Sequence, residues 1–125
     1  MSGLTLDTGA LIALERGNRF VAALLQRAIA AKADIVLPTT VIAQAMRDPA
    51  RQVALNLLLR ASATSIADLD RPTAVAVGRI LAVSRTSDIT DAHVALTATT
   101  RNHTIVTSDP EDLAALAPNC ELIEV

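Results

Sequence analysis

At 125 residues, the chain is long enough for one domain with its own core, and we expect residues 1–125 to form a single domain. Hydrophobic residues make up 51% of the chain but aromatic residues only 1%, which argues against a nucleic-acid surface built on stacked rings. The net charge of −2 and the isoelectric point near 5.6 exclude a generally polybasic surface, so an anionic substrate would need a metal ion and locally placed arginines.

Short apolar runs alternate with longer helical stretches along the whole chain. In order, the pattern predicts a strand at 4–6, helices at 9–14 and 19–31, a strand at 35–37, helices around 41–46 and 50–60, a strand at 62–67, helices at 72–83 and 89–100, a strand at 104–107, a helix at 110–116 and a strand at 121–125. Asn18, Pro49, Pro72 and Pro110 mark helix starts. This alternation predicts an α/β fold, a three-layer α/β/α sandwich with a mostly parallel central sheet.

Acidic side chains follow the apolar runs at several of these boundaries. Asp7 ends the first strand, Asp109 follows the fourth, and Asp91 lies in the first turn of a helix. Ligand sites in such sheets form outside the carboxyl ends of the strands, so we expect these three carboxylates to converge. Carboxylates ~6 Å apart repel by roughly 3 kcal/mol per pair at an effective dielectric near 20, and a hard cation such as Mg²⁺ or Mn²⁺ relieves that repulsion.

Each aspartate also has a structural explanation. Asp7 and Asp109 stand where N-caps are expected, and Asp88 can cap the helix that has Asp91 at its third position. Caps are commoner than metal ligands, so both interpretations stay open for each residue taken singly.

At these same residues the chain resembles a known family. Leu6-Asp7-Thr8-Gly9-Ala10 is similar to the opening motif of PIN-domain ribonucleases, Asp91-Ala92-His93-Val94 to their helix-borne acidic motif, and Val106-Thr107-Ser108-Asp109 to their final one. The resemblance extends over essentially the whole chain and is strongest to VapC-like toxins of toxin–antitoxin pairs. It implies a Mg²⁺- or Mn²⁺-dependent endoribonuclease with an RNA substrate, usually homodimeric and inhibited by a cognate antitoxin. It also implies that Asp7, Asp91 and Asp109 are metal-site carboxylates.

The chain departs from that family at one position. Gln44 stands where the family usually has a glutamate, which lowers the charge of the site by one. Asp88 would restore this charge if it points inward, because it lies three residues before Asp91. The departure motivates a competing hypothesis, a catalytically silent PIN-like module that binds RNA or a protein.

Other features complete the expectations. The single cysteine, Cys120, fits a reducing compartment, and no run approaches the ~20 apolar residues of a membrane span, so we expect a cytoplasmic protein.

His93 lies about 200° around the helix from Asp91 and is expected to be packed rather than a ligand. The apolar helices at 20–31 and 50–59 are expected to form a hydrophobic groove that receives an antitoxin segment, and charge substitutions at Leu24 or Leu58 are expected to probe that groove.

Overall fold

The computed structural model describes residues 2–125 and has a five-stranded sheet at its centre. The strands are β1 (Leu4–Leu6), β2 (Ile35–Pro38), β3 (Thr64–Ala67), β4 (Thr104–Thr107) and β5 (Leu122–Glu124). All neighbouring strands pair in parallel, in the order β3-β2-β1-β4-β5. The strand order therefore reverses between β1 and β4, and a crevice outside the carboxyl ends of these two strands is the expected position of a ligand site.

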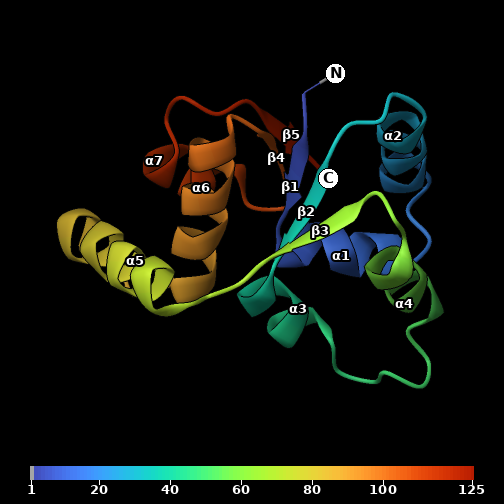
Figure 1. The fold of residues 1–125 in the computed structure, drawn as a ribbon, viewed down its shortest axis with the longest axis horizontal. Helices are drawn as coiled ribbons and strands as arrows, with labels where there is room; N and C mark the ends of the chain where they lie inside the picture. The colour runs from blue at the N-terminus through green and yellow to red at the C-terminus, as the bar shows by residue number, and fades with distance from the viewer. Residues whose placement is uncertain (1) are drawn as a thin grey trace.

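Seven helices surround this sheet. They are α1 (Thr8–Glu15), α2 (Arg19–Ala30), α3 (Thr39–Ala45), α4 (Val53–Arg60), α5 (Arg71–Ser84), α6 (Ile89–Arg101) and α7 (Pro110–Leu116). Figure 1 shows α1, α2 and α4 on one side of the sheet and α5, α6 and α7 on the other. The predicted three-layer α/β/α architecture is thus confirmed, with a sheet that is wholly parallel.

The burial of the strands explains why the short apolar runs identified them. Every residue of β1, β2 and β4 is buried, as expected for central strands covered by helices on both faces, whereas the outer strands β3 and β5 are only partly buried. The core is built from aliphatic side chains, and the single aromatic residue, Phe20, is 50% exposed.

Side-chain caps fix the starts of several helices. Asn18 accepts a hydrogen bond from the Val21 N–H and begins α2, and Asp70 accepts one from the Thr73 N–H and begins α5. Arg85 and Asn102 end α5 and α6 in the left-handed conformation. These local interactions begin and end the helices where the fold requires it, so the predicted boundaries of these helices fall close to the observed ones.

Two expectations about the helices were wrong. The helix predicted from residue 50 begins at Val53, because the Gln52 side chain folds back to accept hydrogen bonds from the Arg47 and Asp48 N–H groups and holds the preceding residues in a turn. Leu24 and Leu58 belong to the core, at 4% and 7% exposure, because α2 and α4 turn these residues towards the sheet.

Within residues 2–125, no helix has both the length and the apolar character needed to cross a membrane.

Candidate metal and active site

Asp7 lies at the point where β1 runs into α1. The parallel register pairs Leu6 with Val106, and the Asp7 N–H donates to the Val106 carbonyl at 3.0 Å. One oxygen of the Asp7 carboxylate accepts from the Ala10 N–H at 2.8 Å, and the other accepts from Thr107 Oγ1 at 2.5 Å. Burial raises the pKa of Asp7, and these hydrogen bonds partly offset that effect. Asp7 is therefore both a helix cap and a buried acid beside the end of β4.

Gly9 allows the first turn of α1 to approach the end of β4 closely. A Cβ atom at this position would overlap the Oγ and Cβ atoms of Ser108. The absence of a side chain at Gly9 thus brings the segment that carries Asp7 against the loop that carries Asp109.

A cluster of three carboxylates lies at this edge of the molecule. One oxygen each from Asp91, Asp109 and Asp112 lie within 4.8 Å of one another. Asp109 precedes α7 but makes no capping hydrogen bond through its side chain, and its N–H instead donates to Thr107 Oγ1 at 2.8 Å. The cap proposed for Asp109 is therefore not formed, and its carboxylate is left to face the other two.

Asp112 was missed by the sequence reasoning. It lies in the first turn of α7, three residues after Asp109, and the spacing that suggested Asp88 as a partner of Asp91 would also have identified it. The pKa of the Asp112 carboxyl is raised, first by its hydrogen bond to the Asp109 side chain and second by the negative charge of that group.

Asp91 has the most informative electrostatics of the cluster. Burial and the surrounding negative charges, with Asp88 and Asp109 foremost among them, raise its pKa to about 7. The only ion pair within 4.0 Å among residues 2–125 joins Arg51 to Asp48, so none of the protein's cations neutralises this group at contact distance. Without a bound cation, Asp91 therefore keeps its proton up to about pH 7 and is ionised only above it.

Asp88 acts as the N-cap of α6. One oxygen of its carboxylate accepts from the Asp91 N–H at 2.9 Å, and its side chain is exposed. The cap interpretation therefore holds, but the charge of Asp88 still acts on Asp91. Asp88 and Asp91 also line a small cavity of about 170 Å³ with Asp112.

Gln44 lies beside the start of α1 rather than among the three clustered carboxylates. Its Oε1 atom accepts a hydrogen bond from Thr8 Oγ1 at 2.6 Å, which joins α3 to the residue after Asp7. The Gln44 side chain is exposed, so it borders the site without adding a negative charge.

The donor set fits a hard divalent cation. Oxygen ligands of Mg²⁺, Mn²⁺ or Ca²⁺ lie ~2.0–2.6 Å from the ion, so two ligands of one ion are at most roughly 5 Å apart. The oxygens of Asp91, Asp109 and Asp112 meet this limit, whereas Asp7 lies outside that closest set. An acidic crevice at the switch point of a parallel sheet, with a carboxyl whose pKa is about 7, defines a candidate metal-dependent catalytic site.

Comparison with known proteins identifies the family of the chain. The model of the PIN domain family matches residues 4–117, so the chain belongs to this family and the resemblance inferred from its motifs is confirmed. No curated protein sequence matches the chain.

Solved structures share the fold over nearly their whole length. VapBC2 from Rickettsia felis, bound to a DNA fragment from its promoter, has a chain that is 19% identical, with a TM-score of 0.72 and coverage of 99% of this chain and 98% of that one. DNA-bound VapBC from Salmonella typhimurium gives 18% identity, a TM-score of 0.69 and coverage of 99% and 98%. FitAcB from Neisseria gonorrhoeae gives 21% identity, a TM-score of 0.67 and coverage of 97% of this chain and 96% of that one.

Proposed function

We propose that this protein is a metal-dependent endoribonuclease and the toxin of a toxin–antitoxin pair. The observation that carries the proposal is the cluster of Asp91, Asp109 and Asp112 at the switch point of a PIN-family fold, with the pKa of Asp91 raised to about 7. Uncompensated carboxylates of this kind favour a divalent cation, and Mg²⁺ or Mn²⁺ is the cofactor that suits their oxygens.

The acidic residues at this site have different roles. Asp91, Asp109 and Asp112 would hold the cation, which supplies an activated water and neutralises charge at the scissile phosphate. Asp7 accepts from Thr107, and Thr107 in turn accepts from the Asp109 N–H, so this pair fixes the backbone from which Asp109 projects. Asp88 keeps the first turn of α6 in place and adds negative charge beside Asp91.

The RNA substrate would be held through its backbone. The chain has no aromatic platform beyond Phe20, and the cations nearest to the site in sequence, Arg47 and Arg85, are exposed. Arginine binds phosphate in a bidentate manner, so a few such contacts can position a strand on an otherwise acidic protein.

The partners follow from the relatives and from exposed apolar residues. Two of the structural relatives are VapBC2 and VapBC bound to DNA and a third is FitAcB, which supports a cognate antitoxin for this chain. Because Leu24 and Leu58 are buried, docking on α2 and α4 would use the outward-facing Phe20, Val53 and Leu57. We also propose a homodimer.

Gln44 supports one alternative, a PIN-like module that binds RNA or protein with little or no catalysis. A neutral amide beside Thr8 leaves the site with one carboxylate fewer than the family usually has, which would weaken metal binding.

Cleavage of RNA by the purified chain, freed of any partner, distinguishes these functions. We expect cleavage of single-stranded or looped RNA with Mg²⁺ or Mn²⁺, none in excess EDTA, and at least a ~100-fold loss in Asp91→Asn with the fold retained by circular dichroism. RNA binding without metal-dependent cleavage in wild type would favour the silent module. Cleavage that persists in EDTA would refute the metal mechanism.

A further inference from the structure

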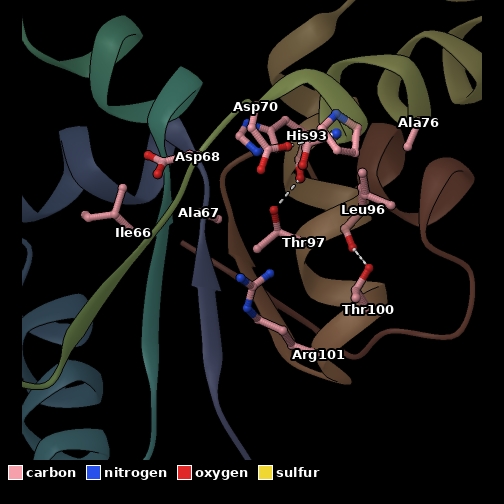
Figure 2. A pocket seen from close by; sticks show the side chains of 12 residues that line it. Ile66, Ala67, Asp68, Asp70, Ala76, His93, Leu96, Thr97, Thr100 and Arg101 are labelled. Carbon is pink, nitrogen blue, oxygen red and sulfur yellow. Dashed lines mark hydrogen bonds between the residues drawn. The ribbon is translucent and has the colours of Figure 1, made fainter.

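A second cavity, of about 420 Å³, lies between α6 and the connection from β3 into α5. Figure 2 shows Ile66, Ala67 and Asp68 along one wall and Leu96, Thr97 and Thr100 of α6 along the other. His93 lines this cavity, and it lies about 200° around α6 from Asp91, so the cavity is separate from the carboxylate cluster. Its volume falls within the range of small-molecule sites.

His93 has an unsatisfied nitrogen that is buried beside this cavity. The imidazole is fully buried, and its Nδ1 atom is hydrogen-bonded to Thr40 Oγ1 of α3 at 2.8 Å. Its Nε2 atom is buried and has no partner in the described part of the chain. A buried polar atom without a partner is unfavourable, so this nitrogen favours a bound group that completes its hydrogen bonding.

The hydroxyl groups on the α6 wall can only accept hydrogen bonds from a ligand. Thr97 Oγ1 already donates to the His93 carbonyl and Thr100 Oγ1 to the Leu96 carbonyl, each at 2.7 Å, as the dashed lines in Figure 2 show. Each hydroxyl has one hydrogen, so only oxygen lone pairs remain free. This wall therefore suits a ligand that is rich in N–H donors.

The charges around the cavity are separated. Asp70 lies close to His93 at one end of the cavity. Arg101 lies at the other end, further along α6 towards its C-terminus (Figure 2). Asp68 adds a second carboxylate from the connection after β3. Among residues 2–125, none of these three charged groups forms an ion pair within 4.0 Å.

We propose that this cavity binds a basic amino acid, with its side-chain guanidinium or ammonium group at the Asp68 and Asp70 end and its carboxylate on Arg101. In this arrangement Nδ1–H of His93 donates to Thr40, and the ligand's N–H groups donate to the Thr97 hydroxyl oxygen and to Nε2 of His93, which a small movement of the covering side chains must first expose. His93 and Arg101 are eight residues apart, ~12 Å along the helix axis, and the Arg101 side chain turns back into this span, which leaves room for an extended molecule. The proposal does not depend on nuclease activity.

The test is a titration of the isotope-labelled full chain with L-arginine and L-lysine, followed through the His93 ring nitrogens and the amides of α6. We expect saturable shifts at Nε2 of His93. Asp68→Asn and Arg101→Gln should each weaken binding roughly tenfold, equivalent to ~1.4 kcal/mol. Agmatine lacks the carboxylate of arginine, so it should bind wild type more weakly than arginine does. Agmatine and arginine should bind Arg101→Gln with equal affinity.

Two control variants locate the binding. Glu124→Gln makes the same charge change as Asp68→Asn at an exposed residue of β5, and Asp112→Asn removes an acid from the carboxylate cluster, where a guanidinium could also bind. Both should leave the affinity read at His93 unchanged. The proposal is overturned if neither amino acid gives a saturable shift at His93, if the cavity variants bind as tightly as wild type, or if a nucleotide such as GMP binds there instead.

Discussion

The Asp91 carboxyl makes the stability of the metal-free protein depend on pH. Its pKa is about 7 in the fold against an ordinary value of 3.8, so between these values the folded state binds a proton that the unfolded state has lost. Stability from this group is therefore greatest below about pH 4 and falls as the pH rises towards 7. We expect thermal melts in EDTA to show that fall, and Asp91→Asn to be more stable than wild type at pH 8 by ~1 kcal/mol.

Divalent metal should reverse that order. Mn²⁺ binds only the native cluster, so it should raise the melting temperature of wild type at pH 8 and raise that of Asp91→Asn much less. Asp34→Asn, a change at an exposed acid outside the cluster, should behave like wild type in both conditions. Equal metal shifts in wild type and Asp91→Asn would remove Asp91 from the site.

Gln44 allows a second test at the level of one residue. Gln44→Glu keeps an oxygen that accepts from Thr8 and adds a negative charge at the edge of the site, so Mn²⁺ affinity should tighten several-fold, up to ~10-fold. Calorimetric titration measures this change. Gln26→Glu, which adds the same charge to an exposed position of α2, is the matched control and should not alter the affinity. An unchanged affinity in Gln44→Glu would place Gln44 outside the metal's reach.

The residues at the ends of strands were the part of the candidate site that the sequence predicted. Asp7 and Asp109 follow buried strands and Asp91 follows a helix start, so their common edge was predictable from apolar runs and parallel topology. Asp112 was missed because it does not follow an apolar run, and its three-residue spacing from Asp109 in the first turn of α7 was not used. The bond between His93 and Thr40 joins residues 53 apart, and no local pattern in the sequence indicates such a contact.

At the level of elements, the boundaries could be predicted wherever a local signal and the fold agree. Proline or a side-chain cap marks the starts of α2, α5 and α7, and these were expected within about one residue. The start of α4 was placed three residues early because Pro49 suggested a first turn, whereas the bond from Gln52 Nε2 to the Ala45 carbonyl holds a loop there. That contact depends on where α3 ends, which the local pattern did not define.

The approach of α1 to the β4–α7 loop can be tested through Gly9. Gly9→Ala places a methyl group on Ser108, so we expect a loss of ~1–3 kcal/mol of unfolding free energy, measured by urea denaturation. Ser108→Gly in the same chain should restore part of this loss, because it removes the overlapping atoms. Gly78→Ala in α5 is the control: apart from its chain neighbours and the backbone of α5, no atom lies within 4 Å of the added methyl, and stability should rise by ~0.5–1 kcal/mol. Additive effects of the changes at Gly9 and Ser108 would contradict the contact.

At the scale of the whole molecule, the outer side of α5 has the strongest features of a self-association surface. Val83 is 86% exposed and Val75 is 51% exposed, and Val83 borders an apolar groove of about 350 Å³ with Ile80 and Leu116. A two-fold interface would bury each of these residues twice, and burial of one valine contributes ~1.5–3 kcal/mol. This surface is therefore where we expect the homodimer to form.

Light scattering of the isolated protein at micromolar concentration should give the mass of a dimer. Val83→Asp should convert it to a monomer, because a charge introduced on both copies would weaken association by roughly 100-fold or more. The folding stability of the chain should change by less than ~0.5 kcal/mol, since Val83 makes few contacts within its own subunit. Leu57→Asp on α4, 63% exposed in wild type, is the matched control and should leave the dimer intact. A dimer that persists in Val83→Asp and dissociates in Leu57→Asp would move the interface to the opposite face of the sheet.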